Sequence, residues 1–215
     1  DLRMSRGLGD VYKRQVLSGN AVFFMDGYDR AMKISSKGYP GLDVSEAETE
    51  KVLRGSKEGF CDSVKTNAAL VRKRIRDTRL KVEQQNIGVR SNTVVQLLYV
   101  EDLVHEELLI AVKERLESFT VDGILDSGML EQLTEEAWYS PFPQFQTTER
   151  PDRAAQELLN GKAVLLCDNS PVALVIPGAF NSFMESSEDW YNRFEMTSFL
   201  RVCLLYTSPS PRDMR

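Results

Sequence analysis

Histidine, cysteine and long apolar stretches are scarce in this sequence. Its 215 residues include one histidine, His105, and three cysteines. A metal centre needs several ligands at fixed spacing, and the acidic residues around His105 do not provide that spacing. The sequence therefore predicts no metal or cofactor site, and His105 is expected to face solvent on a helix.

The cysteines fit neither a disulfide framework nor a redox motif. Cys61 and Cys167 stand alone, without a Cys-x-x-Cys spacing, and are expected to be buried thiols of a reducing compartment. A nucleophilic Cys61 would need the distant His105 as its base. Because no nucleophile–base pair and no phosphate-binding loop can be assembled, the chain is not predicted to be an enzyme.

No stretch of the sequence is apolar for long enough to cross a bilayer. The apolar runs 163–167 and 172–176 are five residues each, whereas a spanning helix needs about 20. These runs are instead typical of buried strands.

Both ends of the chain resemble translated sequencing adapter. Codons can be chosen for Ser5–Gln15 that, reverse-complemented and read one base out of frame, encode Cys203–Asp213. We expect 1–15 and 202–215 to be non-native tails and 16–201 to be the native part. The tails hold six of the 27 basic and three of the 32 acidic residues, which leaves 21 against 29 and a net charge of −8. An acidic body of this kind argues against a nucleic-acid partner.

The periodicity of apolar residues predicts mixed secondary structure in a fixed order. The fold class expected is α/β (mixed α+β), with two small α/β subdomains, 16–140 and 141–201, joined by a Pro-rich connector at 140–146. The predicted elements are a hairpin of 21–25 with 31–34, helix 62–76, strands 80–87 and 93–99, helix 104–119, a short strand at 120–121, helices 129–136 and 151–160, and strands 163–166 and 172–176.

The segment Ser140–Asp152 reads SPFPQFQTTERPD and contains three prolines. Pro141 and Pro143 favour an extended connector because each fixes φ and removes an amide donor. Pro151 suits the first turn of a helix, Asp152 places a carboxylate at its positive end, and Gly161 suits a left-handed C-terminal cap. A helix is therefore predicted to begin at Pro151.

Several segments together resemble one known family. Pro-Phe-Pro followed by Thr-Glu-Arg-Pro-Asp, the run Arg54–Phe60 and the run Asn67–Arg74 are similar, in order and spacing, to the soluble N-terminal domain of GerA-type spore germinant receptor A subunits. The sequence departs from the family at Ala47 and Ser56, where proline is common, and at Lys57, where arginine is common. Lysine keeps the charge but loses the bidentate fork.

The resemblance implies a function in nutrient sensing and signal transduction that triggers spore germination. It implies receptor B and C subunits as partners, a small nutrient as a candidate ligand, and attachment to the spore inner membrane through a transmembrane region missing after Arg201, with this domain on the cytoplasmic or core side. Two alternatives stay open: a related A-subunit-like sporulation protein that modulates ion or dipicolinate release, and an unrelated soluble α/β ligand-binding protein.

Seven polar residues are the candidates for structural or interaction roles. The basic run of helix 62–76 indicates either a solvated face paired with glutamates or a surface for an anionic membrane or partner. Arg150 precedes a helix that is already acidic, so its fork is expected to find a carboxylate on a facing subdomain, or an anionic ligand. The candidates are Arg54, Asn67, Arg72, Arg74, Glu149, Arg150 and Asp152.

Overall fold

The fold is taken from a computed structural model, which describes residues 20–23, 32–35, 47, 49–50, 56–135, 143–178 and 203. Two strands form a separate hairpin, and the remaining elements form the main body. In chain order the elements are β1 (Asn20–Phe23), β2 (Met32–Ser35), α2 (Val64–Arg74), β3 (Leu80–Ile87), β4 (Thr93–Val100), α3 (Glu106–Ser118), α4 (Ser127–Thr134), β5 (Gln146–Thr148), α5 (Pro151–Leu159), β6 (Ala163–Cys167) and β7 (Ala173–Ile176).

The main body is built on one five-stranded sheet. Its strand order is β3-β4-β6-β7-β5, and every neighbouring pair is antiparallel. The long β3–β4 hairpin keeps a continuous register from Leu80 opposite Val100 to Ile87 opposite Thr93. The chain is therefore mixed α/β, with four helices and a five-stranded antiparallel sheet in its described part.

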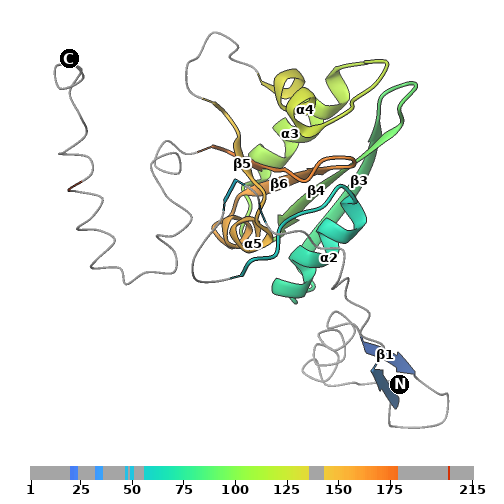
Figure 1. The fold of residues 1–215 in the computed structure, drawn as a ribbon, viewed down its shortest axis with the longest axis vertical. Coiled ribbons are helices and arrows are strands. Elements are labelled where there is room, and N and C mark those ends of the chain that lie inside the picture. Colours follow the sequence, from blue (N-terminus) through green and yellow to red (C-terminus); the bar gives the residue numbers. More distant parts are fainter. Residues whose placement is uncertain are drawn as a thin grey trace.

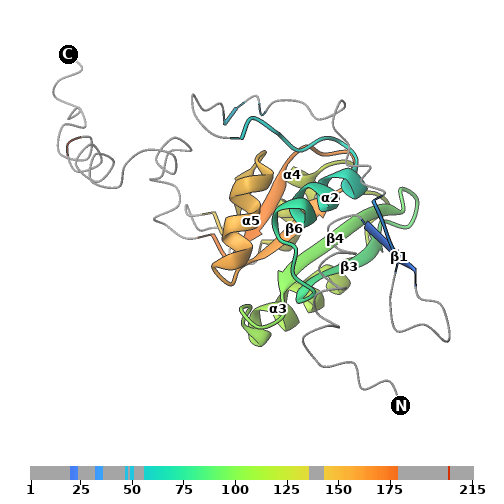
Figure 2. The ribbon, with the colours of Figure 1, turned by 90° about the horizontal axis from the view of Figure 1, so that it is seen from below.

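Helices cover both faces of this sheet. Figure 1 shows α3 and α4 on one side and α2 and α5 on the other. Side chains alternate between the faces, so Leu98 packs in the cluster with α2 and α5 while Leu97 packs in the cluster with α3 and α4. Since both faces are covered, β6 and β7 are buried along their whole length, as their continuous apolar runs indicate. Figure 2 shows α5 and α2 side by side over the sheet.

Local chemistry sets the bounds of α5. Pro151 occupies the first turn, where the missing amide is not needed. Gly161 follows the helix with φ +86°, and a Cβ there would lie 2.7 Å from the Leu103 carbonyl oxygen. The predicted helix start and left-handed cap are both confirmed.

Most other predicted elements are also confirmed. The hairpin of β1 and β2, the helices α2, α3 and α4, and the strands β3, β4, β6 and β7 lie within a few residues of their expected positions. His105 is exposed just before α3, and Cys167 is buried.

Three expectations are wrong. Residues 120–121 are not a strand, and residues 146–148, where no strand was predicted, form β5. Cys61 is half-exposed, because it lies at the surface just before α2. β4 and β6, which come from either side of residue 140, hydrogen-bond to each other in one sheet. The division into two subdomains stays a prediction.

Candidate functional site

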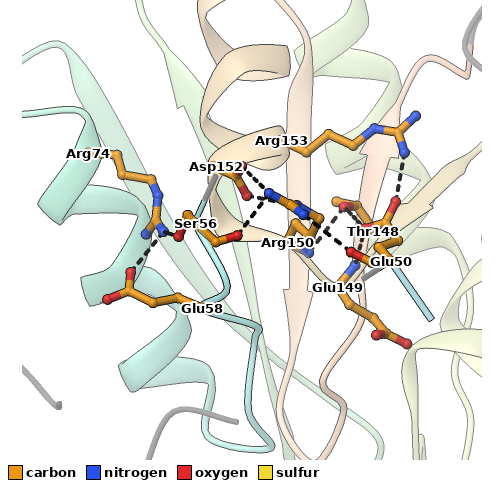
Figure 3. Close-up of polar contacts among 9 residues, drawn as sticks. All are labelled: Glu50, Ser56, Glu58, Arg74, Thr148, Glu149, Arg150, Asp152 and Arg153. Carbon is orange, nitrogen blue, oxygen red and sulfur yellow. Dashed lines mark hydrogen bonds and ion pairs between the residues drawn. The ribbon is translucent and has the colours of Figure 1, made fainter. Parts of the chain in front are cut away.

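Arg150 lies at the centre of a buried polar network where β5 ends and α5 begins. It is the N-cap residue of α5 and is only 2 % exposed. Its guanidinium donates to Asp152 at two points, from Nε to Oδ1 at 3.1 Å and from Nη2 to Oδ2 at 2.7 Å. A two-point contact of this kind orients the planar fork as well as neutralising its charge. Figure 3 shows the guanidinium lying between Asp152 and the residues that precede α2.

The same guanidinium holds the segment before α2, which we call the strap and define as Thr49, Glu50 and Ser56–Phe60. Arg150 donates from Nη1 to the Glu50 carbonyl at 3.2 Å and from Nη2 to the Ser56 carbonyl at 3.0 Å. Backbone carbonyls accept these bonds whatever the side chain at those positions. Arg150 therefore connects two parts of the strap to the start of α5 (Figure 3).

Glu50 anchors the strap a second time, through its own side chain. Its Oε2 accepts from Thr148 Oγ1 at 2.7 Å and from the Glu149 amide at 3.1 Å, and its Oε1 lies 2.7 Å from Nη1 of Arg153. Both charged side chains of the Glu50–Arg153 pair are largely buried. A buried pair of this kind is costly to break, because removing one partner leaves the other charge uncompensated.

Glu149 completes the contact between the strap and β5. Its side chain accepts from the Thr49 amide at 3.1 Å, and its carbonyl accepts from the Phe60 amide at 2.8 Å. The strap is thus joined to the chain just after β5 by one backbone hydrogen bond and by the Glu50 and Glu149 side chains.

The C-terminal turn of α2 binds the other side of the strap. Arg74 donates to Ser56 Oγ at 3.0 Å and to Glu58 Oε2 at 2.8 Å, and Lys73 donates to Glu58 Oε1 at 2.7 Å. The hydrogen bond from Lys73, with a smaller contribution from Arg74, holds the pKa of Glu58 below its usual value, although partial burial opposes the shift. Of the two alternatives for the basic run of this helix, pairing with a glutamate is the one that Lys73 and Arg74 follow.

Asn67 has a structural position at the start of α2. It is 1 % exposed; its amide donates to the Cys61 carbonyl at 2.6 Å, and its Oδ1 accepts from the Cys61 amide at 2.9 Å. Arg72 is half-exposed and makes no side-chain hydrogen bond among the described residues. Arg54 lies outside the described residues.

Five of the seven predicted residues belong to this region. Among the described residues, Arg150 binds the carboxylate of Asp152, two positions further along its own helix. A carboxylate on a facing subdomain, or an anionic ligand, stays a prediction. Sequence reasoning missed Glu50, Glu58 and Arg153. The sequence shows only that charged residues are dense on either side of Ser56 and Pro151. That density does not specify which acidic side chain pairs with which basic one.

The chemistry of the network is structural. In the part of the chain that the structure describes, no three histidine, cysteine, aspartate or glutamate side chains gather as metal ligands would. Arginine guanidinium groups do not titrate in the physiological range and so cannot act as acids or bases there. The arrangement can hold and orient backbone segments.

A hollow of about 470 Å³ lies between α3 and the ends of β5 and β7. It is lined mainly by apolar side chains, among them Leu108, Val112, Phe145 and Ile176, with Arg115 at its wall. Arg115 donates to the Thr134 and Glu135 carbonyls at the end of α4. The hollow is large enough for a small molecule.

Comparisons with known proteins agree with this fold. The family model described as "Bacillus/Clostridium GerA spore germination protein" matches residues 7–207. Similar proteins from Bacillus subtilis include "Uncharacterized membrane protein YfkQ", 39% identical over 86% of this chain and 36% of its own length, and "Spore germination protein KA", 37% identical over 87% of this chain and 35% of its own. The chain thus spans little more than a third of the length of these relatives.

A solved structure is also similar. The N-terminal domain of the A subunit of the Bacillus megaterium spore germinant receptor GerK3 is 30% identical, with a TM-score of 0.57, over 79% of this chain and 60% of that one. The chain belongs to the GerA family of spore germination proteins and corresponds to the N-terminal domain of a receptor A subunit. Because the chain belongs to this family, the alternative of an unrelated soluble α/β ligand-binding protein is excluded. No helix among the described residues is long and apolar enough to cross a membrane.

Proposed function

We propose that this chain is the soluble domain of a spore germinant receptor A subunit that takes part in nutrient sensing and in the signal transduction that triggers germination. The observation that supports this most directly is the similarity, over most of the chain, to the N-terminal domain of the A subunit of GerK3. The domain supplies no reaction chemistry. It acts through the positions of its segments.

The Arg150 network is the part of the domain suited to that role. The strap is held to α2, β5 and α5 by charged groups that are mostly buried, and such fixed connections would pass a displacement of one segment on to the others. Arg74, Glu149, Arg150 and Asp152 would serve as structural residues, and Asn67 would fix the turn into α2. Arg72, which stays outside the network, is the candidate for contact with a partner or an anionic membrane surface.

The full-length protein would be a membrane protein of the spore inner membrane, assembled with receptor B and C subunits. Its transmembrane region would follow residue 201, with this domain on the cytoplasmic or core side. A small nutrient could bind in the hollow beside Arg115, which has the size of a small-molecule site.

A second candidate function is that of a related A-subunit-like sporulation protein that tunes ion or dipicolinate release. It is favoured by one observation: "Stage V sporulation protein AF" of Bacillus subtilis is 35% identical over 87% of this chain. This sequence identity is close to those of the relatives named as spore germination proteins. The same domain therefore occurs in proteins that carry different names.

Sequencing the gene beyond residue 201 tests the membrane-receptor proposal at once. Several apolar segments of about 20 residues each are expected directly downstream. A stop codon, or a second polar domain, would contradict it. Neighbouring genes for B-like and C-like subunits would then favour the receptor over the sporulation homologue.

A further inference from the structure

The charge of Arg115 is not neutralised by any carboxylate among the described residues. Its guanidinium donates from Nε to the Thr134 carbonyl at 3.3 Å and from Nη2 to the Glu135 carbonyl at 3.0 Å. These bonds use two of the five N–H groups of a guanidinium, and Nη1 makes no hydrogen bond in the part of the chain that the structure describes. Arg115 therefore keeps both a positive charge and unused donors.

The two helices that Arg115 connects, α3 and α4, do not supply an acidic partner for it. The positions three and four residues away in the chain are not acidic; they are Ala111, Val112, Ser118 and Phe119. On α4, burial and, to a smaller extent, Glu135 raise the pKa of Glu131, whereas a bound guanidinium would lower it. The carbonyls at the negative end of the α4 dipole compensate only part of a unit charge.

This guanidinium lines the hollow of about 470 Å³ beside α3. The walls are mainly apolar, with Leu108 and Val112 from α3, Phe145 from the residues before β5 and Ile176 from the end of β7. A cavity of this size, with apolar walls and one charged group that fixes orientation, is typical of a small-molecule site.

The segments that border the hollow are fixed before any ligand binds. The Gly178 amide donates to the Gln144 carbonyl at 2.6 Å, and both residues line the hollow. β5 and β7, which lie directly beside them in the chain, are adjacent antiparallel strands. Arg115 is itself held by the end of α4. A ligand would therefore meet a site that is largely formed in advance, which lowers the entropic cost of binding.

We propose that the hollow binds a small carboxylate with a short aliphatic body, which places its carboxylate on Arg115 and its body against the apolar walls. The planar carboxylate suits the fork of a guanidinium, which can offer it two parallel N–H donors. The inference rests on the proposed function only in taking this ligand to be the nutrient that the receptor domain senses.

The two halves of the hollow select this class of ligand together. Phosphate and sulfate are hydrated on all sides, and their oxygens would lose water against Leu108 and Val112 without gaining hydrogen bonds. An uncharged apolar molecule would leave the charge of Arg115 as uncompensated as it is in the free domain. A carboxylate with an aliphatic body neutralises the charge and fills the apolar part.

NMR titration of the full 215-residue chain tests the proposal with isovalerate and isovaleramide, which share a shape and differ in charge. We expect saturable binding of isovalerate and an affinity about ten- to a hundredfold lower for isovaleramide, as for the loss of a hydrogen bond to a charged group. L-Valine, the α-amino derivative of isovalerate, shows by its relative affinity whether the site favours amino acids or simple acids. Inorganic phosphate should not displace isovalerate.

Arg115→Gln removes the charge but keeps a donor for the carbonyls at the end of α4. It should lower the affinity for isovalerate about ten- to a hundredfold and leave that for isovaleramide unchanged. Arg90→Gln is the matched control, because Arg90 is exposed and does not line the hollow, and it should change neither affinity.

A second variant keeps the test decisive if Arg115→Gln fails to fold. Ala111 lines the hollow from an exposed position of α3, so Ala111→Trp would fill part of it and retain the hydrogen bonds of Arg115. It should weaken the binding of both probes, whereas Glu114→Trp, at an exposed position of the same helix outside the hollow, should weaken neither.

A wild-type chain that binds neither probe, or that binds both equally, would overturn the inference, as would displacement of isovalerate by phosphate. Binding that Ala111→Trp does not weaken would place the ligand elsewhere and overturn it as well. These results would leave the receptor proposal standing, because the sequence beyond residue 201 tests that proposal separately. A stop codon there would contradict the receptor and leave the carboxylate site as a property of this chain.

Discussion

Asp152 binds the Arg150 guanidinium at two points although the two residues are only two positions apart in the chain. This local pair leaves the remaining donors of the fork directed at the Glu50 and Ser56 carbonyls, nearly one hundred residues away in sequence. A short-range ion pair therefore positions a long-range anchor, and the strap depends on both.

Arg150→Lys should lower the free energy of unfolding by about 1–3 kcal/mol without any ligand, because a single ammonium cannot make the two-point contact and reach both carbonyls. Denaturant melts of the two proteins measure the difference. Arg90→Lys is the matched control, since the Arg90–Asp122 pair is exposed and 3.9 Å long. Superimposable curves for wild type and Arg150→Lys would exclude the anchor.

In the basic C-terminal turn of α2, Lys73 should contribute to the stability of the fold and Arg72 should not. Lys73→Glu places a like charge against Glu58 and should cost about 1 kcal/mol, as expected for a partly exposed pair, whereas Arg72→Glu should change stability by less. Arg72→Glu should in turn weaken binding to anionic vesicles more than Lys73→Glu does. Equal stability losses for the two variants would contradict this division.

The pH dependence of stability that Glu131 of α4 contributes should have the opposite sign from that of a salt-bridged carboxylate. Burial, with a smaller contribution from Glu135, raises the pKa of Glu131, so the folded state disfavours its ionised form. The penalty is present above the folded pKa and absent below the unfolded value of about 4.5.

Glu131→Gln should therefore raise the melting temperature at pH 7 and have almost no effect below pH 4. Thermal melts over this range check the sign. The exposed Glu117→Gln on α3 serves as the control. A variant that is less stable than wild type at pH 7 would show that the ionised carboxylate is favoured in the fold.

The tails 1–15 and 202–215 are expected to contribute nothing to stability, since they resemble translated adapter. Trimming to 16–201 should change the free energy of unfolding by less than about 0.5 kcal/mol, as for other changes away from the core. A loss of several kcal/mol in a denaturant melt would show that a tail packs on the domain.

The sequence predicts the elements better than their assembly. The patterns of β3, β4 and α5 are set by neighbouring residues, through alternation, a proline at the helix start and a glycine at its end, and all three elements appear where expected. β5 escapes prediction because it has only three residues and follows Pro143. Three residues are too few for strand propensity or alternation of apolar residues to indicate a strand.

Long-range pairing is what local patterns cannot specify. The β4–β6 ladder joins the two halves of the chain, and nothing in either strand alone indicates its partner. The same holds for Arg150: its burial and its strap contacts depend on the path of residues 49–60, which carries no periodic signal. The family resemblance identified the right segments without revealing these contacts.

In a working germinant receptor, the contact of Arg150 with the strap is expected to matter for signalling. The most direct measurement is nutrient-triggered germination of spores in which residues 16–201 replace the matching segment of spore germination protein KA, whose 37% identity permits the exchange. We predict that the chimera restores germination, that its Arg90→Lys form does so equally, and that its Arg150→Lys form responds weakly. A chimera that accumulates to the normal level yet leaves the spores unresponsive would contradict the account.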